Sequence, residues 1–171
     1  FTGSLDHFIN RTKEIESIHN FIGDNDTRFL LVTGPGGYGK SALMEKLIKE
    51  VTNNFSSNNK PFKHNIDSVV WVDLSVEENR SVDTFVNLLC KTFPENKSID
   101  YKRAWNNESN FSHKLDFLFG RLLGRDRRLI ILDNFESILD NTNISDHYKD
   151  IEVFINAFLN IDHAAILVAT S

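Results

Sequence analysis

The chain has 171 residues, 40% of them hydrophobic and 25% charged, which is ordinary for one globular domain or for part of a larger one. A net charge of −5 argues against a broadly basic nucleic-acid-binding surface but leaves room for a local patch. No apolar run approaches the ~20 residues that a bilayer-spanning helix needs, and the single cysteine, Cys90, excludes an internal disulfide. We therefore expect no membrane contact, a cytoplasmic location and Cys90 in the core.

The first half of the chain reads as helix, strand, loop and helix. Ile15, Ile18 and Ile22 recur at helical spacing and predict a helix over 12–22 that Gly23 ends. Residues 28–33 read as a short buried strand, and residues 42–52 read as a second helix. The stretch between the strand and this helix carries the most informative motif.

Residues 34–41 form a complete G-x-x-x-x-G-K-S phosphate-binding loop. The glycines let successive backbone N–H groups curl around phosphate oxygens, Lys40 is suited to the β- and γ-phosphates, and the Ser41 hydroxyl is suited to Mg²⁺. The dipole of the following helix would add to the site. We expect nucleotide contacts from Gly34, Pro35, Gly36, Gly37, Tyr38, Gly39, Lys40, Ser41 and Ala42.

The second half of the chain continues the alternation of strands and helices. The polar stretch 95–110 has no clear assignment, and we expect its Tyr101 and Trp105 to pack onto the domain in preference to meeting a partner. Ser81 and Ser145 precede two helical patterns as N-cap candidates. The expected elements are a loop over 53–65, a strand over 69–74, helices over 82–93 and 111–123, a strand over 129–132, a helix after Ser145 through 159, and a strand over 165–169.

Asp133 follows the third strand, at the sheet edge where ligands collect in open α/β folds. A carboxylate in that place can hold the Mg²⁺ that bridges nucleotide phosphates. The signal is weak alone but strong after a phosphate-binding loop, with a strand and two helices between them. Arg127 and Arg128, at the start of the same strand, we interpret as solvent-facing.

These motifs together resemble the Walker A and Walker B pair of P-loop NTPases, in surroundings similar to the STAND class, which includes NB-ARC, AP-ATPase and NACHT proteins. Three further segments carry the resemblance: residues 8–15 match the family's N-terminal segment, residues 70–75 its second strand, and residues 132–136 its Walker B form. The resemblance spans residues 8–171 and implies ATP or ADP with Mg²⁺ as ligands. It also implies a signal-transduction or defence role in which the full-length protein self-associates.

The resemblance assigns roles to individual residues. It places Phe8, Ile9 and Arg11 against the adenine base, although Asn10 stands where the family has glycine. Asn134 occupies the place of a second acid in many relatives, so Glu136 becomes the candidate for orienting the attacking water. An interpretation of equal weight is that Glu136 is an acid at the start of a helix, where its charge interacts favourably with the helix dipole. Asp133 and Glu136 are thus the catalytic candidates, and Ser41 and Asp133 the metal ligands.

We predict a three-layer P-loop α/β domain over residues 1–171. The resemblance implies a parallel sheet whose order resembles 1-4-3-2, truncated before the family's fifth strand. Because the chain starts with Phe1 and not Met, we expect a fragment of a longer multidomain protein. The predicted function is the nucleotide-binding core of a STAND-type switch with slow ATPase activity. Two alternatives stay open: an AAA+ motor or nucleic-acid loader, which shares the loop and the acid, and a small-molecule kinase, for which we find no acceptor pocket or lid.

Overall fold

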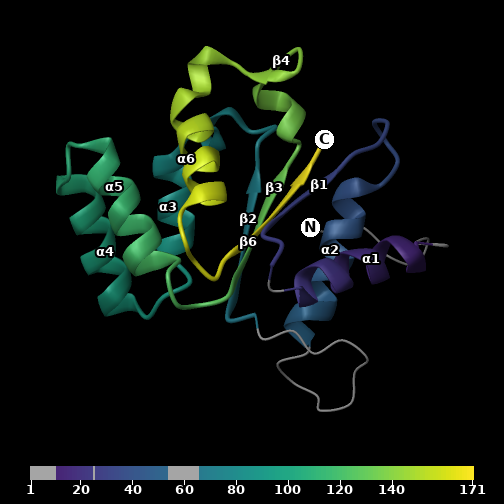
Figure 1. The fold of residues 1–171 in the computed structure, drawn as a ribbon, viewed down its shortest axis with the longest axis horizontal. Helices are drawn as coiled ribbons and strands as arrows, with labels where there is room; N and C mark the ends of the chain where they lie inside the picture. Colours follow the sequence, from purple (N-terminus) through teal and green to yellow (C-terminus); the bar gives the residue numbers. More distant parts are fainter. Residues whose placement is uncertain (1–10, 25, 54–65) are drawn as a thin grey trace.

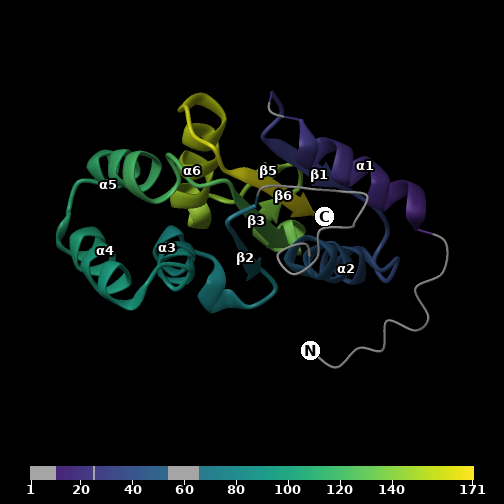
Figure 2. The ribbon, with the colours of Figure 1, turned by 90° about the horizontal axis from the view of Figure 1, so that it is seen from below.

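The computed structural model describes residues 11–24, 26–53 and 66–171. A four-stranded parallel sheet stands between two layers of helices (Figures 1 and 2). Its strands are β1 (Phe29–Val32), β2 (Ser68–Asp73), β3 (Arg128–Asp133) and β6 (Ile166–Thr170), in the order β1-β6-β3-β2. Numbered along the chain, this is the predicted order 1-4-3-2, and the three-layer α/β fold is confirmed.

Helices α1 (Thr12–Gly23) and α2 (Lys40–Asn53) cover one face of the sheet (Figure 2). Alternate side chains of the central strands reach this layer: Leu129 and Ile131 of β3 belong to the same buried cluster as the helices' apolar residues. Ile130 and Leu132 point to the other face. A strand that is buried on both sides has no polar face, which explains the unbroken apolar runs in the sequence.

The opposite face is covered by α3 (Val82–Cys90) and α6 (Lys149–Asn160), and α4 (Glu95–Asn107) and α5 (Phe111–Phe117) lie outside them, farther from the sheet (Figures 1 and 2). Phenylalanine rings pack together in the core here: Phe119 stacks on Phe154 with ring centroids 6.0 Å apart, and Phe154 meets Phe85 and Phe158. Cys90 is fully buried in this cluster, and burial raises the pKa of its thiol. Cys90 therefore lies in the hydrophobic core, as predicted.

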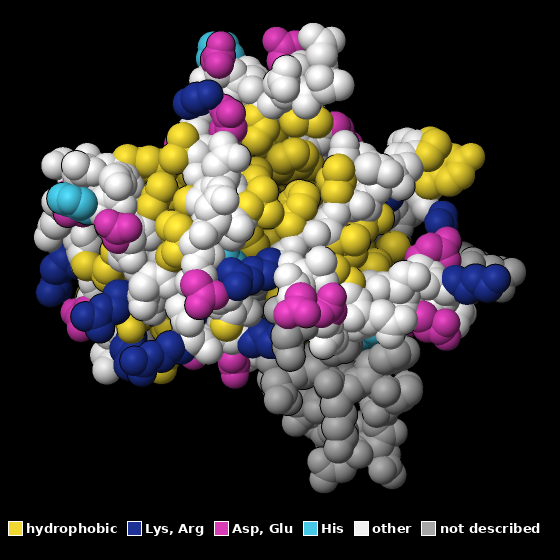
Figure 3. Space-filling model, in the orientation of Figure 1, with side chains coloured by type: hydrophobic (Ala, Val, Ile, Leu, Met, Phe, Trp, Pro, Cys, Tyr) yellow, Lys and Arg dark blue, Asp and Glu magenta, His cyan; other side chains and the backbone are white. Residues whose placement is uncertain are grey.

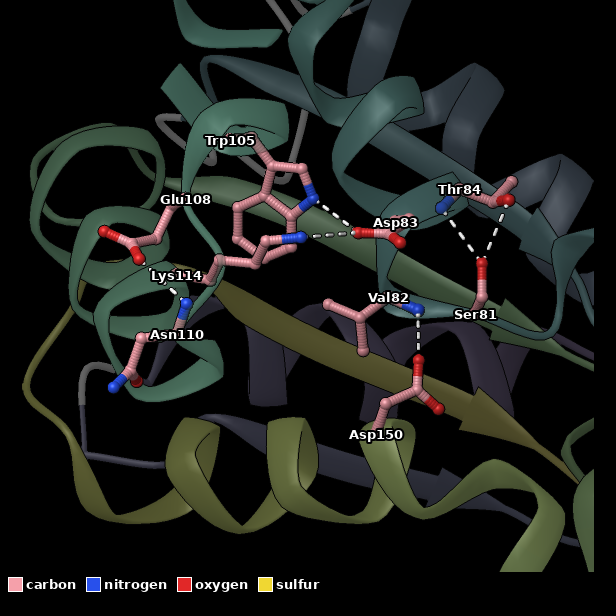
Figure 4. Close-up of polar contacts among 9 residues, drawn as sticks. All are labelled: Ser81, Val82, Asp83, Thr84, Trp105, Glu108, Asn110, Lys114 and Asp150. Atoms are coloured by element: carbon pink, nitrogen blue, oxygen red, sulfur yellow. Dashed lines mark hydrogen bonds and ion pairs between the residues drawn. The ribbon is translucent and has the colours of Figure 1, made fainter. Parts of the chain in front are cut away.

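Trp105 packs onto the domain, as predicted, with 1% of its surface exposed. Its indole Nε1 donates a 2.6 Å hydrogen bond to Asp83 Oδ1, and the Lys114 ammonium lies 4.9 Å from its ring centroid (Figure 4). Ser81 Oγ accepts from Thr84 N at 3.1 Å, which confirms the predicted cap of α3. These contacts join α3, α4 and α5 into one layer.

Several predicted boundaries on this face were wrong. The α3 helix ends at Cys90, before residue 93, because Lys91, Thr92 and Phe93 close it with tight bonds to carbonyls three residues back. The unassigned stretch 95–110 contains α4, with Pro94 at its N-cap. The predicted 111–123 helix is α5 followed by a π-helical segment, Leu118–Leu122, in which Leu123 N bonds to Leu118 O at 2.9 Å.

Ser145 does not cap the last helix with its side chain. A short 3₁₀ turn, Asp146–Tyr148, comes first, and α6 begins at Lys149. Before it, β4 (Leu139–Asp140) and β5 (Asn143–Ile144) form a small antiparallel hairpin that the sequence analysis did not anticipate. Of the predicted 53–65 loop, only Asn53, the last residue of α2, lies within the described residues.

The interpretation of Arg128 as solvent-facing was wrong. Its side chain is buried, and its guanidinium binds Leu122 O at 3.1 Å, Ser68 Oγ and Thr92 Oγ1 at 2.6 Å each, and the carboxylate of Asp126. The buried charge is tolerated because each nitrogen of the guanidinium donates a hydrogen bond to an acceptor. Arg127 is half-buried and donates to Ile22 O at 2.6 Å, which ties the start of β3 to α1.

Within the described ranges, no helix combines the length and the apolar character that crossing a membrane requires.

Candidate nucleotide-binding site

The predicted phosphate-binding loop connects β1 to α2 at the carboxyl edge of the sheet. Gly37 and Gly39 have φ values of 78° and 76°, a region that costs a side-chain-bearing residue about 1 kcal/mol or more. An added Cβ would meet nothing within 4 Å at either position, so the constraint there is the backbone angle and not crowding. This geometry accounts for the spacing of the two glycines in the motif.

The end of β6 supports the start of this loop. Gly34 N donates to Ser171 O at 3.1 Å, and Ser171 N donates to Val32 O at 3.0 Å. Lys40, the first residue of α2, turns its ammonium across the loop and donates to Gly34 O at 2.7 Å and to Pro35 O at 3.3 Å. A cation is thus placed within the curve of the loop, as phosphate binding requires.

Asp133 and Ser41, predicted as metal ligands, lie together. Asp133 ends β3 and is 3% exposed, and its Oδ1 accepts from Ser41 Oγ at 3.2 Å. Among the described residues, no cluster of three or more His, Cys, Asp or Glu could hold a metal. One hydroxyl and one carboxylate nevertheless suit Mg²⁺, which takes few protein ligands and completes its shell with phosphate and water. The donors present therefore fit the predicted ion.

Thr170 belongs to the same network, through a contact with Asp133 that was not predicted from the sequence. Its hydroxyl donates to Asp133 Oδ1 at 2.5 Å and accepts from Asn134 N at 3.1 Å. The signal that could have revealed it is strand order, since β6 pairs directly with β3 and both end at this edge. Three elements, α2, β3 and β6, thereby meet at one carboxylate.

Asn134, in place of a second acid, adopts a left-handed conformation with φ 58° and ψ 47°, which asparagine tolerates better than most residues. Its Nδ2 donates to Asp73 Oδ1 at 2.8 Å, and Ser75 donates to the same oxygen from its backbone N and its hydroxyl. Burial on its own raises the pKa of Asp73, but these hydrogen bonds outweigh it and hold the pKa below its ordinary value. Asp73, another unassigned residue, is thus kept ionised beside Asn134.

Glu136 lies in the first turn of the 3₁₀ segment Phe135–Ile138. Its side chain is exposed and makes no hydrogen bond or ion pair with the part of the chain that is described. It follows Asp133 by three residues in the chain, and its catalytic role stays a prediction. Both earlier readings of this residue, water orientation and a favourable acid at a helix start, remain compatible with its position.

Arg11 reaches the phosphate-binding loop from the start of α1. Its Nη2 donates to Tyr38 O at 2.8 Å, while Nη1 pairs with Glu14 at 3.0 Å. Arg11 therefore contacts the phosphate-binding loop, and its contact with adenine stays a prediction. Phe8 and Ile9, the other two residues predicted to contact adenine, lie outside the described residues.

A protein family described as an ATPase domain predominantly from Archaea matches residues 8–171. The chain belongs to this ATPase family. Membership and the complete loop together identify a nucleotide-binding P-loop ATPase domain. The match supports neither the STAND class nor any other subdivision specifically.

Two individual proteins also resemble this ATPase domain. An uncharacterised WD repeat-containing protein of Nostoc sp. is 23% identical over 168 residues, which cover 96% of this chain but only 12% of that protein. The conjugation coupling protein TcpA of pCW3, solved as a monomer with ATPgS, is 15% identical with a TM-score of 0.40 and matches 84% of this chain and 42% of its own. At that TM-score the likeness to TcpA carries no argument.

Asn134→Asp should lower stability at pH 7, because an amide donor becomes a second carboxylate facing Asp73. We expect a loss of about 1–2 kcal/mol in the free energy of unfolding, from the lost charged hydrogen bond and the new repulsion. The repulsion raises the pKa of one partner, so the loss is present at neutral pH and shrinks as the pH falls through that value. Urea unfolding at pH 7 and pH 4.5 measures both effects.

Asn141→Asp is the matched control, since Asn141 also has positive φ, 56°, but is exposed. It should change stability by less than about 0.5 kcal/mol. Equal losses in the two variants would show that the contact between Asn134 and Asp73 has no special weight.

Proposed function

We propose that this ATPase domain is the ATP- and ADP-binding core of a STAND-type signalling or defence NTPase, in which the bound nucleotide controls opening and self-assembly of a longer protein. The observation that carries the proposal is the network around Asp133. It joins the first turn of α2, the end of β3 and the end of β6. Loss of the terminal phosphate would therefore alter the contacts of three elements at once.

Binding rests on residues that the loop already orients. Lys40 can exchange its bonds to Gly34 O and Pro35 O for bonds to phosphate oxygens, since all are acceptors for the same ammonium. Ser41 and Asp133 would hold Mg²⁺, which neutralises phosphate charge when bound. Arg11 links the loop to α1 through Tyr38 O, which supports an adenine-side role for the N-terminal segment.

The switch assignment has support from outside the site. The Nostoc protein carries WD repeats, and repeat domains attached to a P-loop core are typical of the STAND class, to which residues 8–15, 70–75 and 132–136 also point. Because this chain spans only 12% of that protein, the activity and partners of any longer form remain part of the proposal. Self-association would belong to that longer form.

A switch of this kind should hold its nucleotide through purification. Mass analysis of denatured protein should find adenine nucleotide, ADP above all. Lys40→Ala should weaken binding at least tenfold, or ~1.4 kcal/mol, because the charge facing the phosphates is gone. Lys49→Ala, an exposed lysine two turns further along α2, should retain the nucleotide. Guanine nucleotide in the wild-type protein would contradict the adenine assignment.

Hydrolysis by this domain should be slow, well below the ~10 s⁻¹ typical of enzymes, because the second acid is absent from position 134. Glu136→Gln should lower the remaining Mg²⁺–ATP turnover at least tenfold if its carboxylate orients water. Glu95→Gln, an exposed acid of the first turn of α4, is the control and should leave turnover unchanged. Rapid turnover that is indifferent to Glu136→Gln would refute the assigned role.

A further inference from the structure

A cavity of about 710 Å³ opens at the amino edge of the sheet, at the opposite end of β3 from Asp133. We call it the amino-edge pocket. Its walls are the starts of β2 and β3, the turn between α3 and α4, the exposed side of α4, and the π-helical segment Leu118–Leu122 with the loop that follows. Its volume is that of pockets that bind small organic molecules. No residue of the nucleotide site lines it.

Four basic and two acidic side chains line the amino-edge pocket, and three of these six are already engaged. Asp126 pairs with the buried Arg128, which also donates hydrogen bonds to Leu122 O, Ser68 and Thr92. Asp67 Oδ2 accepts from the backbone N of Arg127 at 2.7 Å. Asp67 is exposed and keeps its negative charge, so the lining carries four cations against two carboxylates.

The three remaining cations are Lys97, Arg121 and Arg125. All are exposed, and none makes an ion pair or hydrogen bond with any described residue. They come from separate elements: α4, the π-helical segment and the loop before β3. In Figure 3, Lys and Arg side chains gather at the lower left, over the region of α4 and α5. An excess of positive charge is thus held around a hollow in a chain whose net charge is −5.

Contacts of Arg128 and Phe93 connect the walls of the pocket to one another. Arg128 ties the start of β3 to β2, to the α3–α4 turn and to the end of the π-helical segment, and its guanidinium lies 4.0 Å from the centroid of the Phe93 ring. Tyr101 meets Phe93 edge-on at 4.9 Å. π-helical insertions of this kind often occur at functional sites, and here the insertion carries Arg121.

We propose that the amino-edge pocket binds a small molecule bearing two or more phosphate groups. Each guanidinium presents a planar fork of N–H donors that matches phosphate oxygens, and the lysine adds a mobile point charge. The cations surround a hollow of limited volume, whereas nucleic acid would need a continuous basic track along the surface. The site lies beyond the reach of the nucleotide loop, so it is an additional binding site of this ATPase domain.

Tripolyphosphate, titrated without divalent metal into protein freed of bound nucleotide while backbone amide resonances are followed by NMR, tests the proposal. Two groups of amides should shift in wild-type protein: those near residues 36–41 and those near residues 120–128. In Arg121→Gln/Arg125→Gln, the second group should bind at least tenfold more weakly while the first is unchanged. Because both side chains are exposed, the remaining resonances should keep their positions and report an intact fold.

Arg103→Gln/Lys149→Gln removes the same charge from exposed positions outside the pocket and should leave both groups of shifts as in wild type. Three results would overturn the proposal. Shifts confined to residues 36–41 would show that no second site exists. An equal loss in the control would reduce the effect to overall charge. A single-stranded oligonucleotide that perturbs residues 120–128 at tenfold lower concentration than tripolyphosphate would make the ligand a nucleic acid.

Discussion

The carboxylate of Asp133 is almost fully removed from water, and the rest of the site is arranged around that constraint. A buried charge costs several kcal/mol unless donors or cations compensate it. Here the compensation comes from hydroxyls on two other elements, Ser41 at the start of α2 and Thr170 at the end of β6. The phosphate-binding loop, the acid-bearing strand and the strand between them are thereby held in one arrangement.

The parallel sheet makes this meeting possible. Strand β6 lies between β1 and β3, so the ends of all three strands share an edge, and the backbone of Ser171 also holds Gly34 at the start of the loop. Strand β2 adds Asp73, which accepts a hydrogen bond from the side chain of Asn134. At the opposite end of β3, Arg128 is also a buried charge, and acceptors on several elements compensate it. Strand β3 thus links the two ends of the domain.

The loop and the four strands followed from local patterns: glycine spacing, apolar runs and the alternation of helix with strand. The order of the strands followed from the resemblance to P-loop NTPases. The contacts of Thr170, Asp73 and Arg128 did not, because they depend on register between segments far apart in the chain. Arg128 was misread since a charged residue beside another arginine is typical of a surface, and its partners lie up to 60 residues away. The π-helical segment was missed because its period differs little from that of an α-helix over one turn.

The most direct test of the account compares ATP affinity with Mg²⁺ and with EDTA, by calorimetry, in wild-type protein and in Asp133→Asn. The substitution keeps an oxygen acceptor for Ser41 and Thr170 but removes the charge that would hold the metal. We predict that Mg²⁺ strengthens binding at least tenfold in wild type and has little effect in Asp133→Asn, while metal-free affinities stay similar. The same Mg²⁺ dependence in both proteins would contradict the assignment of this carboxylate, and with it the central claim.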